Sequence, residues 1–186
     1  MQNHTTIDSP PPPSIHIARV DSPIGRIELT SDGTSITSLA IERDGRLPHD
    51  GQPDASSAVI DTAIAQLSEY FAGTRREFDV PVTLGGTDFQ RSVWRELTDI
   101  PFGEVASYGE IGMATGRPTA GRAVGGAVGA NPVPIIIPCH RVLASNGRIT
   151  GYSGATASRR RNGCWITKAS STGDRSRKCC CRRRRP

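Results

Sequence analysis

Residues 131–142 carry the sequence Asn131-Pro132-Val133-Pro134-Ile135-Ile136-Ile137-Pro138-Cys139-His140-Arg141-Val142. A helix is excluded across residues 131–134 because each proline disfavours the helical conformation in the residue before it. We expect residues 135–138 to form a short buried strand or extended segment that delivers Cys139. Beyond it, residues 142–150 predict a hairpin with its turn at Asn146-Gly147. The segment therefore predicts a positioned cysteine rather than a loose linker.

Cys139 is the candidate nucleophile of the chain. The thiolate is the reactive form of cysteine, and a free thiol with a pKa of about 8.5 is mostly protonated at neutral pH. A base is therefore required, and His140 is the next residue. Adjacency alone does not ensure contact between the two side chains, although a bridging water or a bend at Pro138 could join them. The alternative is a buried structural cysteine beside a surface histidine.

The part of the chain before residue 104 predicts strands followed by helices. Short apolar runs separated by turn residues predict an antiparallel meander. The runs are residues 15–18, 27–29 and 36–41. Apolar side chains then recur at helical spacing over residues 59–71, until Gly73 ends the helix. Another helix is expected to begin at a Thr87 cap and to end near residues 100–103.

Two short helices are predicted directly before the cysteine segment. Ser107 and Glu110 fit a capping box at the start of one helix, which should end at residues 116–118. Thr119 is expected to cap the next helix, which runs to about Gly129. A glycine-containing turn between two such helices indicates a helix-turn-helix. The second helix is rich in glycine and carries Arg122 alone as a charge, so either close packing or close approach to a nucleic-acid backbone must compensate for the glycines.

Charge and cysteine content separate the globular part from the tail. The 186 residues have a formal net charge of +5, but residues 1–154 hold 12 Arg, no Lys and 17 acidic residues. The basic character thus belongs to residues 155–186, and bulk charge is poor evidence for DNA binding by the folded part. Cys139 is the only cysteine before residue 164, so a disulfide framework and a zinc site are not supported.

The start of the chain bears on location. Residues 1–14 are polar and rich in proline, and we expect them to be disordered. They show neither a basic n-region nor an apolar core of a signal peptide. No apolar run approaches the roughly 20 residues of a membrane helix. The expected location is the cytoplasm, with no membrane partner.

The quoted segment, together with Arg122-Ala123-Val124-Gly125-Gly126-Ala127, resembles the active-site signature of the O6-alkylguanine-DNA alkyltransferases, also called methylated-DNA–protein-cysteine methyltransferases. The resemblance spans residues 15–154 and is densest over residues 89–154. It implies an α/β (α+β) fold in which a small ribonuclease-H-like strand-and-helix domain, residues 15–84, precedes a winged helix-turn-helix-like domain, residues 85–154. It also implies repair of DNA damage by a suicide reaction, which transfers the alkyl group of O6-alkylguanine, and of O4-alkylthymine, to Cys139.

The resemblance assigns roles to individual residues. Cys139 would accept the alkyl group and His140 would be the water-mediated base. Tyr108 would assist nucleotide flipping, and Asn131 would stabilise the turn that leads to the active site. The residues expected to contact DNA are Arg122, Thr119, Ala120, Gly121 and Arg141, and those expected to form the base pocket are Val142, Tyr152 and Ser153. The family implies double-stranded DNA as partner, no cofactor, no metal and a monomer.

The sequence departs from the family after Gly154. A helix with a Leu-Leu pair and an acidic residue that orients the histidine is expected there, and residues 155–168 contain no such residue. Back-translation of residues 162–169 from the third base of the Asn162 codon gives Arg or Trp, then Leu, Met or Val, then Leu and Asp, followed by choices that include His, Glu and Gly. A frameshift is therefore our hypothesis for the tail. A metal site at residues 179–181 or a basic arm at residues 182–185 is the alternative.

Two other functions compete with alkyl transfer. One is a damage-binding protein that flips the base and transfers nothing, either natively or because the tail is altered. The other is a helix-turn-helix regulator, which would show sequence preference. Cys139 argues against the first as a native function, and the nearly chargeless helix argues against the second.

Overall fold

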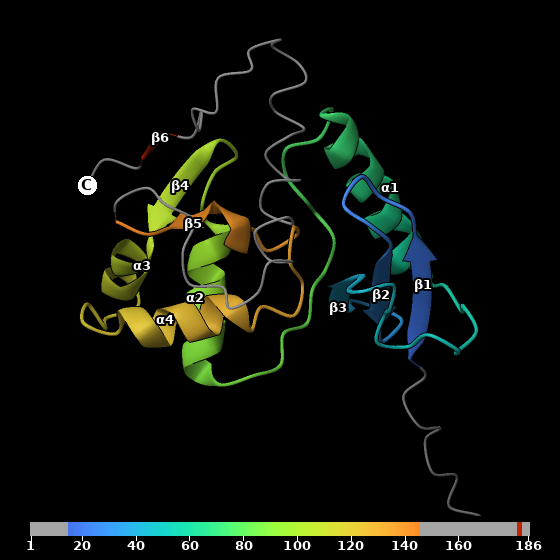
Figure 1. The fold of residues 1–186 in the computed structure, drawn as a ribbon, viewed down its shortest axis with the longest axis horizontal. Coiled ribbons are helices and arrows are strands. Elements are labelled where there is room, and N and C mark those ends of the chain that lie inside the picture. The colour runs from blue at the N-terminus through green and yellow to red at the C-terminus, as the bar shows by residue number, and fades with distance from the viewer. Residues whose placement is uncertain (1–14, 146–181, 184–186) are drawn as a thin grey trace, which may run out of the picture.

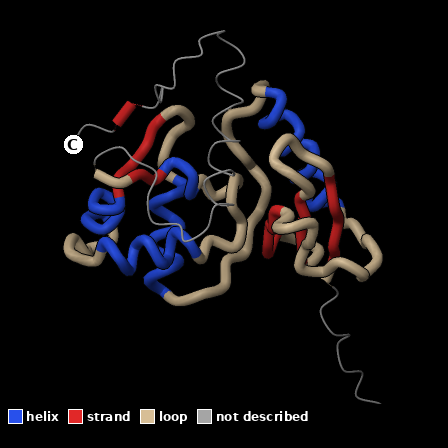
Figure 2. Tube along the Cα trace, viewed as in Figure 1, coloured by secondary structure: helices blue, strands red, loops and turns tan. Residues whose placement is uncertain are grey.

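The computed structural model describes residues 15–145 and the two-residue strand at 182–183. We call residues 15–84 the N-terminal unit and residues 85–145 the C-terminal unit. The two lie side by side, and the connection from the first to the second runs between them (Figure 1). The predicted fold class is confirmed, because strands and a covering helix come first and a mainly helical part follows (Figure 2).

The N-terminal unit is a small antiparallel sheet with one helix. Its strands are β1 (His16–Val20), β2 (Ile27–Ser31) and β3 (Ile36–Ile41), in the order β1-β2-β3. The helix α1 (Ala58–Ala72) ends at Gly73, whose φ of 80° is the left-handed conformation that favours glycine at a helix end. The predicted meander and the predicted end of the helix are both confirmed.

The C-terminal unit is built from three helices and short strands. They are α2 (Asp88–Thr98), β4 (Glu104–Ser107), α3 (Tyr108–Ala114), α4 (Gly121–Gly129), a 3-10 turn η1 (Cys139–Arg141) and β5 (Val142–Leu143). Parallel pairing joins β4 to β5 and to β6 (Arg182–Arg183). The capping boxes at Thr87 and Ser107 are both present, as the sequence predicts. β4 was not predicted, and the rest of the expected hairpin beyond β5 lies outside the described residues.

A common core and a backbone hydrogen bond join the two units. Apolar side chains from the sheet, from α1 and from the helices of the C-terminal unit form one buried cluster. Within it, the indole of Trp94 on α2 donates to the carbonyl oxygen of Ala127 on α4, at 2.8 Å. The amide of Leu39 in β3 donates to the carbonyl oxygen of Pro132 at 2.8 Å. The sheet is thus bonded directly to the segment that leads to Cys139.

Candidate active site

Cys139 and His140 sit together on a buried single turn of 3-10 helix. Cys139 is 7% exposed and His140 is 8% exposed. The amide of Cys139 donates to the carbonyl oxygen of Ile137 at 2.8 Å, and the amide of Arg141 donates to that of Pro138 at 2.9 Å. These bonds fix the backbone on both sides of the thiol. The turn therefore presents a cysteine and a histidine in one rigid, largely water-excluded place.

The segment before the cysteine is a tight turn, and the prediction of a strand or extended segment at residues 135–138 is wrong. The amide of Ile137 donates to the carbonyl oxygen of Val133 at 2.9 Å, which closes the turn. Ile135 is buried and has a φ of 78°. A branched side chain rarely adopts this conformation, and such strain persists only where the surroundings enforce it. Burial of the Ile135 side chain and the closing bond enforce it here.

Asn131 bridges the two ends of this turn. Its side-chain amide donates to the carbonyl oxygen of Ile137 at 2.9 Å, and its side-chain oxygen accepts from the amide of Val133 at 3.0 Å. A single side chain thus satisfies one backbone group on each side of the turn. These are the bonds that the expected turn-stabilising role needs, and the role itself stays a prediction.

His140 contacts a residue that the sequence did not single out. The hydroxyl of Tyr70, on α1, lies 3.4 Å from Nε2 of His140, and both side chains are buried. Tyr70 belongs to the apolar face predicted for its helix, so nothing in the periodicity distinguished it from a core residue. The only signal would have been its hydroxyl, because a buried tyrosine hydroxyl needs a hydrogen-bond partner.

Arg141 turns its guanidinium toward the protein. Its Nη1 donates to the carbonyl oxygen of Ile100 at 2.6 Å, and the guanidinium lies 5.6 Å from the centre of the Phe102 ring. The residue is half-buried. These contacts tie the active-site turn to the loop that leads into β4. A contact of Arg141 with DNA was expected and stays a prediction, while the described contacts are all internal.

Consecutive helices α3 and α4 pack on each other and on α2, as a helix-turn-helix requires. The turn between them closes through Gly112, whose carbonyl oxygen accepts from the amide of Arg117 at 2.7 Å. A Cβ at position 112 would lie 2.9 Å from the carbonyl oxygen of Arg117, so only glycine fits. The predicted Thr119 cap is wrong. α4 begins one residue later, with Ala120 as its cap and no side-chain bond, and Thr119 is exposed in the turn.

The exposed face of α4 is formed by small residues and one arginine. Gly121, Arg122, Gly126 and Gly129 are exposed, whereas Val124, Ala127 and Val128 are buried. Among the described residues, Arg122 makes no ion pair or hydrogen bond. A Cβ placed at Gly121, Gly126 or Gly129 would have no neighbour within 4 Å. Packing among the described residues therefore does not require these three glycines, and the approach of a nucleic-acid backbone to this face stays a prediction.

Tyr108 is the first residue of α3, and its ring borders α4. A Cβ at Gly125 would lie 3.9 Å from Cε1 of Tyr108, which is an ordinary contact distance. Tyr108 is half-buried, so its ring is only partly covered. Val142 is fully buried in β5, beside the end of the 3-10 turn. Tyr152 and Ser153, the other expected base-pocket residues, lie outside the described residues.

Neither a metal cluster nor a spanning helix is found in residues 15–145. No group of three or more histidine, cysteine or acidic side chains in that part could hold a metal ion. No helix there combines the length and apolar character needed to cross a membrane.

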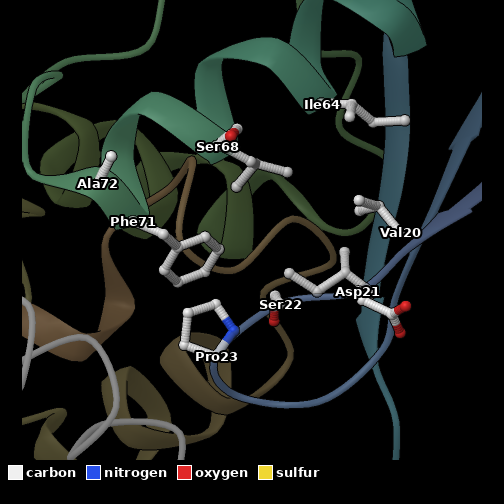
Figure 3. A pocket seen from close by; sticks show the side chains of 10 residues that line it. Val20, Asp21, Ser22, Pro23, Ile64, Ser68, Phe71 and Ala72 are labelled. Atoms are coloured by element: carbon white, nitrogen blue, oxygen red, sulfur yellow. The ribbon is translucent and has the colours of Figure 1, made fainter.

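A cavity of about 320 Å³ lies between the end of β1 and α1, with Phe71 facing Pro23 (Figure 3). Its lining comes only from residues 20–72, so it is separate from Cys139.

Known proteins match both units. Residues 15–84 match the family model described as the ribonuclease-like domain of 6-O-methylguanine DNA methyltransferase, and residues 88–163 match that of its DNA-binding domain. A methylated-DNA–protein-cysteine methyltransferase of Mycobacterium tuberculosis is 46% identical over 140 residues, which cover 75% of this chain and 85% of that protein.

Solved structures of proteins from Mycobacterium tuberculosis have the same fold as this chain. The Mycobacterium tuberculosis O6-methylguanine methyltransferase is 41% identical with a TM-score of 0.74, covering 87% of this chain and 97% of that one. The structure of Mycobacterium tuberculosis OGT in complex with DNA has a TM-score of 0.71 at 42% identity. The match covers 84% of this chain and 93% of that one. With both domain models matched in order and this identity over three-quarters of its length, the chain belongs to the family of methylated-DNA–protein-cysteine methyltransferases.

Proposed function

We propose that this protein repairs DNA by transferring the alkyl group of O6-alkylguanine to the sulfur of Cys139, once per molecule. The observation that carries the proposal is the buried Cys139–His140 pair on its rigid turn, in a chain of this family. Family membership favours transfer over the alternative of a damage-binding protein without chemistry. O4-alkylthymine is a second substrate in the same proposal, because it presents an alkyl group on an exocyclic oxygen in the same way.

The chemistry needs a thiolate and a neutralised leaving group. His140 takes the thiol proton, through a water, and the thiolate attacks the alkyl carbon. The S–C bond forms as the C–O6 bond breaks, and the electron pair of that bond goes to the guanine. Tyr108 supplies a proton to the leaving base, so the base regains a normal guanine, and the proton held by His140 then returns to the tyrosine oxygen through solvent. The thioether product has no leaving group that water can displace, which makes the reaction single-turnover and independent of a cofactor.

The helix-turn-helix α3–α4 is proposed to bring the lesion to the thiol. An alkyl group on O6 lies within the base stack, so the nucleotide must be flipped out at a cost of a few kcal/mol. Arg122 projects from a face of α4 that is otherwise small, and we assign it the gap that the flipped nucleotide leaves in the duplex. Thr119, Ala120 and Gly121 would let α4 approach the DNA backbone closely. Val142, Tyr152 and Ser153 stay the predicted walls of the base pocket.

The decisive experiment follows a labelled alkyl group. The full chain is incubated with duplex DNA that carries O6-[methyl-³H]methylguanine, and the label on protein is mapped by peptide mass spectrometry. We expect one label per molecule on Cys139 and none on a Cys139→Ser variant that binds the same DNA. Binding without transfer by the wild-type chain would instead support the damage-binding alternative. A sequence-dependent affinity for undamaged duplexes would support a regulator.

The residues after 154 are proposed to be read out of frame. The support is the alternative frame at residues 162–169, which encodes a Leu, an Asp and a possible Glu in the order that the family's last helix requires. Resequencing of the gene tests this directly. A frame-corrected chain should melt at a higher temperature, because the restored helix would complete the domain. It should also transfer the alkyl group faster, because a negative charge near His140 favours the imidazolium. Identical melting of the two chains would contradict it. The cytoplasmic location and the monomeric state stay predictions.

A further inference from the structure

Helix α1 of the N-terminal unit brings the hydroxyl of Tyr70 to the active site. Every other residue assigned to the reaction lies in the C-terminal unit. The hydroxyl of Tyr70 lies 3.4 Å from Nε2 of His140, across the boundary between the two units. Tyr70 is 4% exposed, so water does not compete for the hydroxyl. The distance is at the long end for a hydrogen bond, as catalytic contacts often are before the substrate is bound.

The position of the hydroxyl is fixed by an aromatic cluster that we define as Tyr70, Phe71, Phe78 and Phe102. The ring of Tyr70 lies 5.8 Å from that of Phe71, 5.2 Å from that of Phe78 and 6.3 Å from that of Phe102, measured between ring centres. The contacts with Phe71 and Phe102 are edge-on, at 74° and 86°. A tyrosine hydroxyl lies on the axis of its ring, so a ring held by three others places its oxygen at one point.

We propose that Tyr70 is a positioning residue for alkyl transfer, whose hydroxyl accepts a hydrogen bond from Nε2–H of His140 and thereby leaves Nδ1 as the nitrogen that takes the thiol proton. A neutral imidazole carries one proton, and the bond made by one nitrogen decides which tautomer is present. With Nε2 protonated and bonded to Tyr70, Nδ1 carries the lone pair that a base needs. The inference rests on the proposed function, in which His140 activates Cys139.

The same bond serves both protonation states of the histidine. When the thiol proton reaches Nδ1 through a water, the imidazolium still donates from Nε2 to the oxygen of Tyr70. No rearrangement is therefore needed as charge develops. Tyr70 never touches the alkyl group or the guanine, so it acts only through His140. The N-terminal unit would then be required for the chemistry as well as for the fold.

The rate test uses Tyr70→Phe, which removes the hydroxyl and keeps the ring in its cluster. With protein in excess over DNA containing O6-methylguanine, we expect the transfer step to slow about 3- to 10-fold, the range for loss of one hydrogen bond. Affinity for the same DNA should not change, because Tyr70 is buried. The matched control is Ile60→Val, which removes a buried methyl group from the start of the same helix and leaves the aromatic cluster and the hydroxyl in place. It should lower the melting temperature and leave the transfer rate within about twofold.

A spectroscopic measurement tests the tautomer without a variant. In the wild-type chain with ¹⁵N-labelled histidine, the His140 signals, identified by their loss in His140→Gln, should show Nε2 protonated and Nδ1 unprotonated in the neutral imidazole. In Tyr70→Phe the Nε2 signal should move. An Nδ1-protonated wild type, or a Tyr70→Phe variant with an unchanged rate and unchanged nitrogens, would overturn the role of Tyr70. A wild-type chain that transfers no alkyl group would overturn the proposed function instead, and the nitrogen signals would still decide the role of Tyr70.

Discussion

Arg19 in the N-terminal unit and Arg122 in the C-terminal unit are used in opposite ways. In the N-terminal unit Arg19, Arg26 and Arg75 are all paired with carboxylates, and Arg19 meets the buried Glu28. In the C-terminal unit Arg122 stands exposed on α4, without an ion pair to any residue that the structure describes. An arginine that stabilises a fold forms its ion pairs within that fold, whereas an arginine that binds a polyanion must remain exposed. The contrast predicts that arginine networks in the first unit matter for stability and Arg122 matters for DNA.

The largest effect is expected from the buried carboxylate of the N-terminal unit. Glu28 is 1% exposed and accepts from Nε of Arg19 at 3.1 Å and from Nδ1 of His49 at 2.8 Å. Glu28→Ala leaves these donors without their acceptor, so the free energy of unfolding should fall by about 3 kcal/mol. Urea unfolding at neutral pH measures it. Glu42→Ala, which breaks a half-exposed pair with Arg26, should lose less than about 1 kcal/mol. Equal losses of stability in the two variants would contradict the distinction between the buried pair and the half-exposed pair.

Arg122→Ala should slow the reaction with DNA and leave the stability of the fold unchanged. Without the side chain that fills the duplex, alkyl transfer from double-stranded DNA should slow about tenfold, which corresponds to about 1.4 kcal/mol. The reaction with O6-benzylguanine as a free base should keep its rate, because no nucleotide has to be flipped. Melting temperature should not change. Arg95→Ala removes one exposed charge from α2 and serves as control. A loss on the free base as large as that on the duplex would contradict the assigned role.

Gly126→Ala should separate stability from binding within one helix. The added Cβ meets no atom within 4 Å, and an interior glycine costs about 1 kcal/mol relative to alanine, so the free energy of unfolding should rise by about that amount. Affinity for duplex DNA should nevertheless fall, because the methyl group would stand between α4 and the DNA backbone. Calorimetry and a filter-binding titration measure the two quantities. A variant that is more stable and binds equally well would show that DNA does not approach this face at Gly126.

The smallest effect concerns an exposed turn of the N-terminal unit. The carboxylate of Asp32 accepts hydrogen bonds from the amides of Thr34 and Ser35 and from their hydroxyls, and these bonds hold the pKa of Asp32 well below its usual value. A depressed pKa in the folded state contributes stability above the unfolded pKa of about 3.9, and this is lost as the pH falls through the folded value. In Asp32→Ala, the free energy of unfolding should therefore fall slightly less steeply as the pH decreases. Unfolding followed from pH 5 to pH 2 checks this, and superimposable curves would contradict it.

Local rules predicted most of the fold. The caps at Thr87 and Ser107 and the stop at Gly73 were all visible, because a helix end is decided by a few neighbouring residues. β4 was missed because residues 104–107 are too few to show alternation, and their partners come from distant parts of the chain. Distant partners are invisible to local pattern.

The site was only partly predictable for the same reason. The pairing of Cys139 with His140 follows from their adjacency and from the family resemblance. The turn with its strained Ile135 does not, because a run of branched residues ordinarily favours a strand and tertiary packing overrides that preference. Tyr70 was missed because it comes from another unit, 70 residues away along the chain from His140. The early start expected for α4 at Thr119 reflects a preferred capping residue that the turn does not use.

The buried indole bonded to the carbonyl of Ala127 gives this protein an optical reporter of its own. The chain has two tryptophans, Trp94 and Trp165, and the second lies outside the described residues. In a Trp165→Phe chain, emission would come from Trp94 alone, at the junction of α2 and α4. A change in its wavelength on mixing with DNA would then time the arrival of the helix at the duplex in a stopped-flow instrument, without any dye.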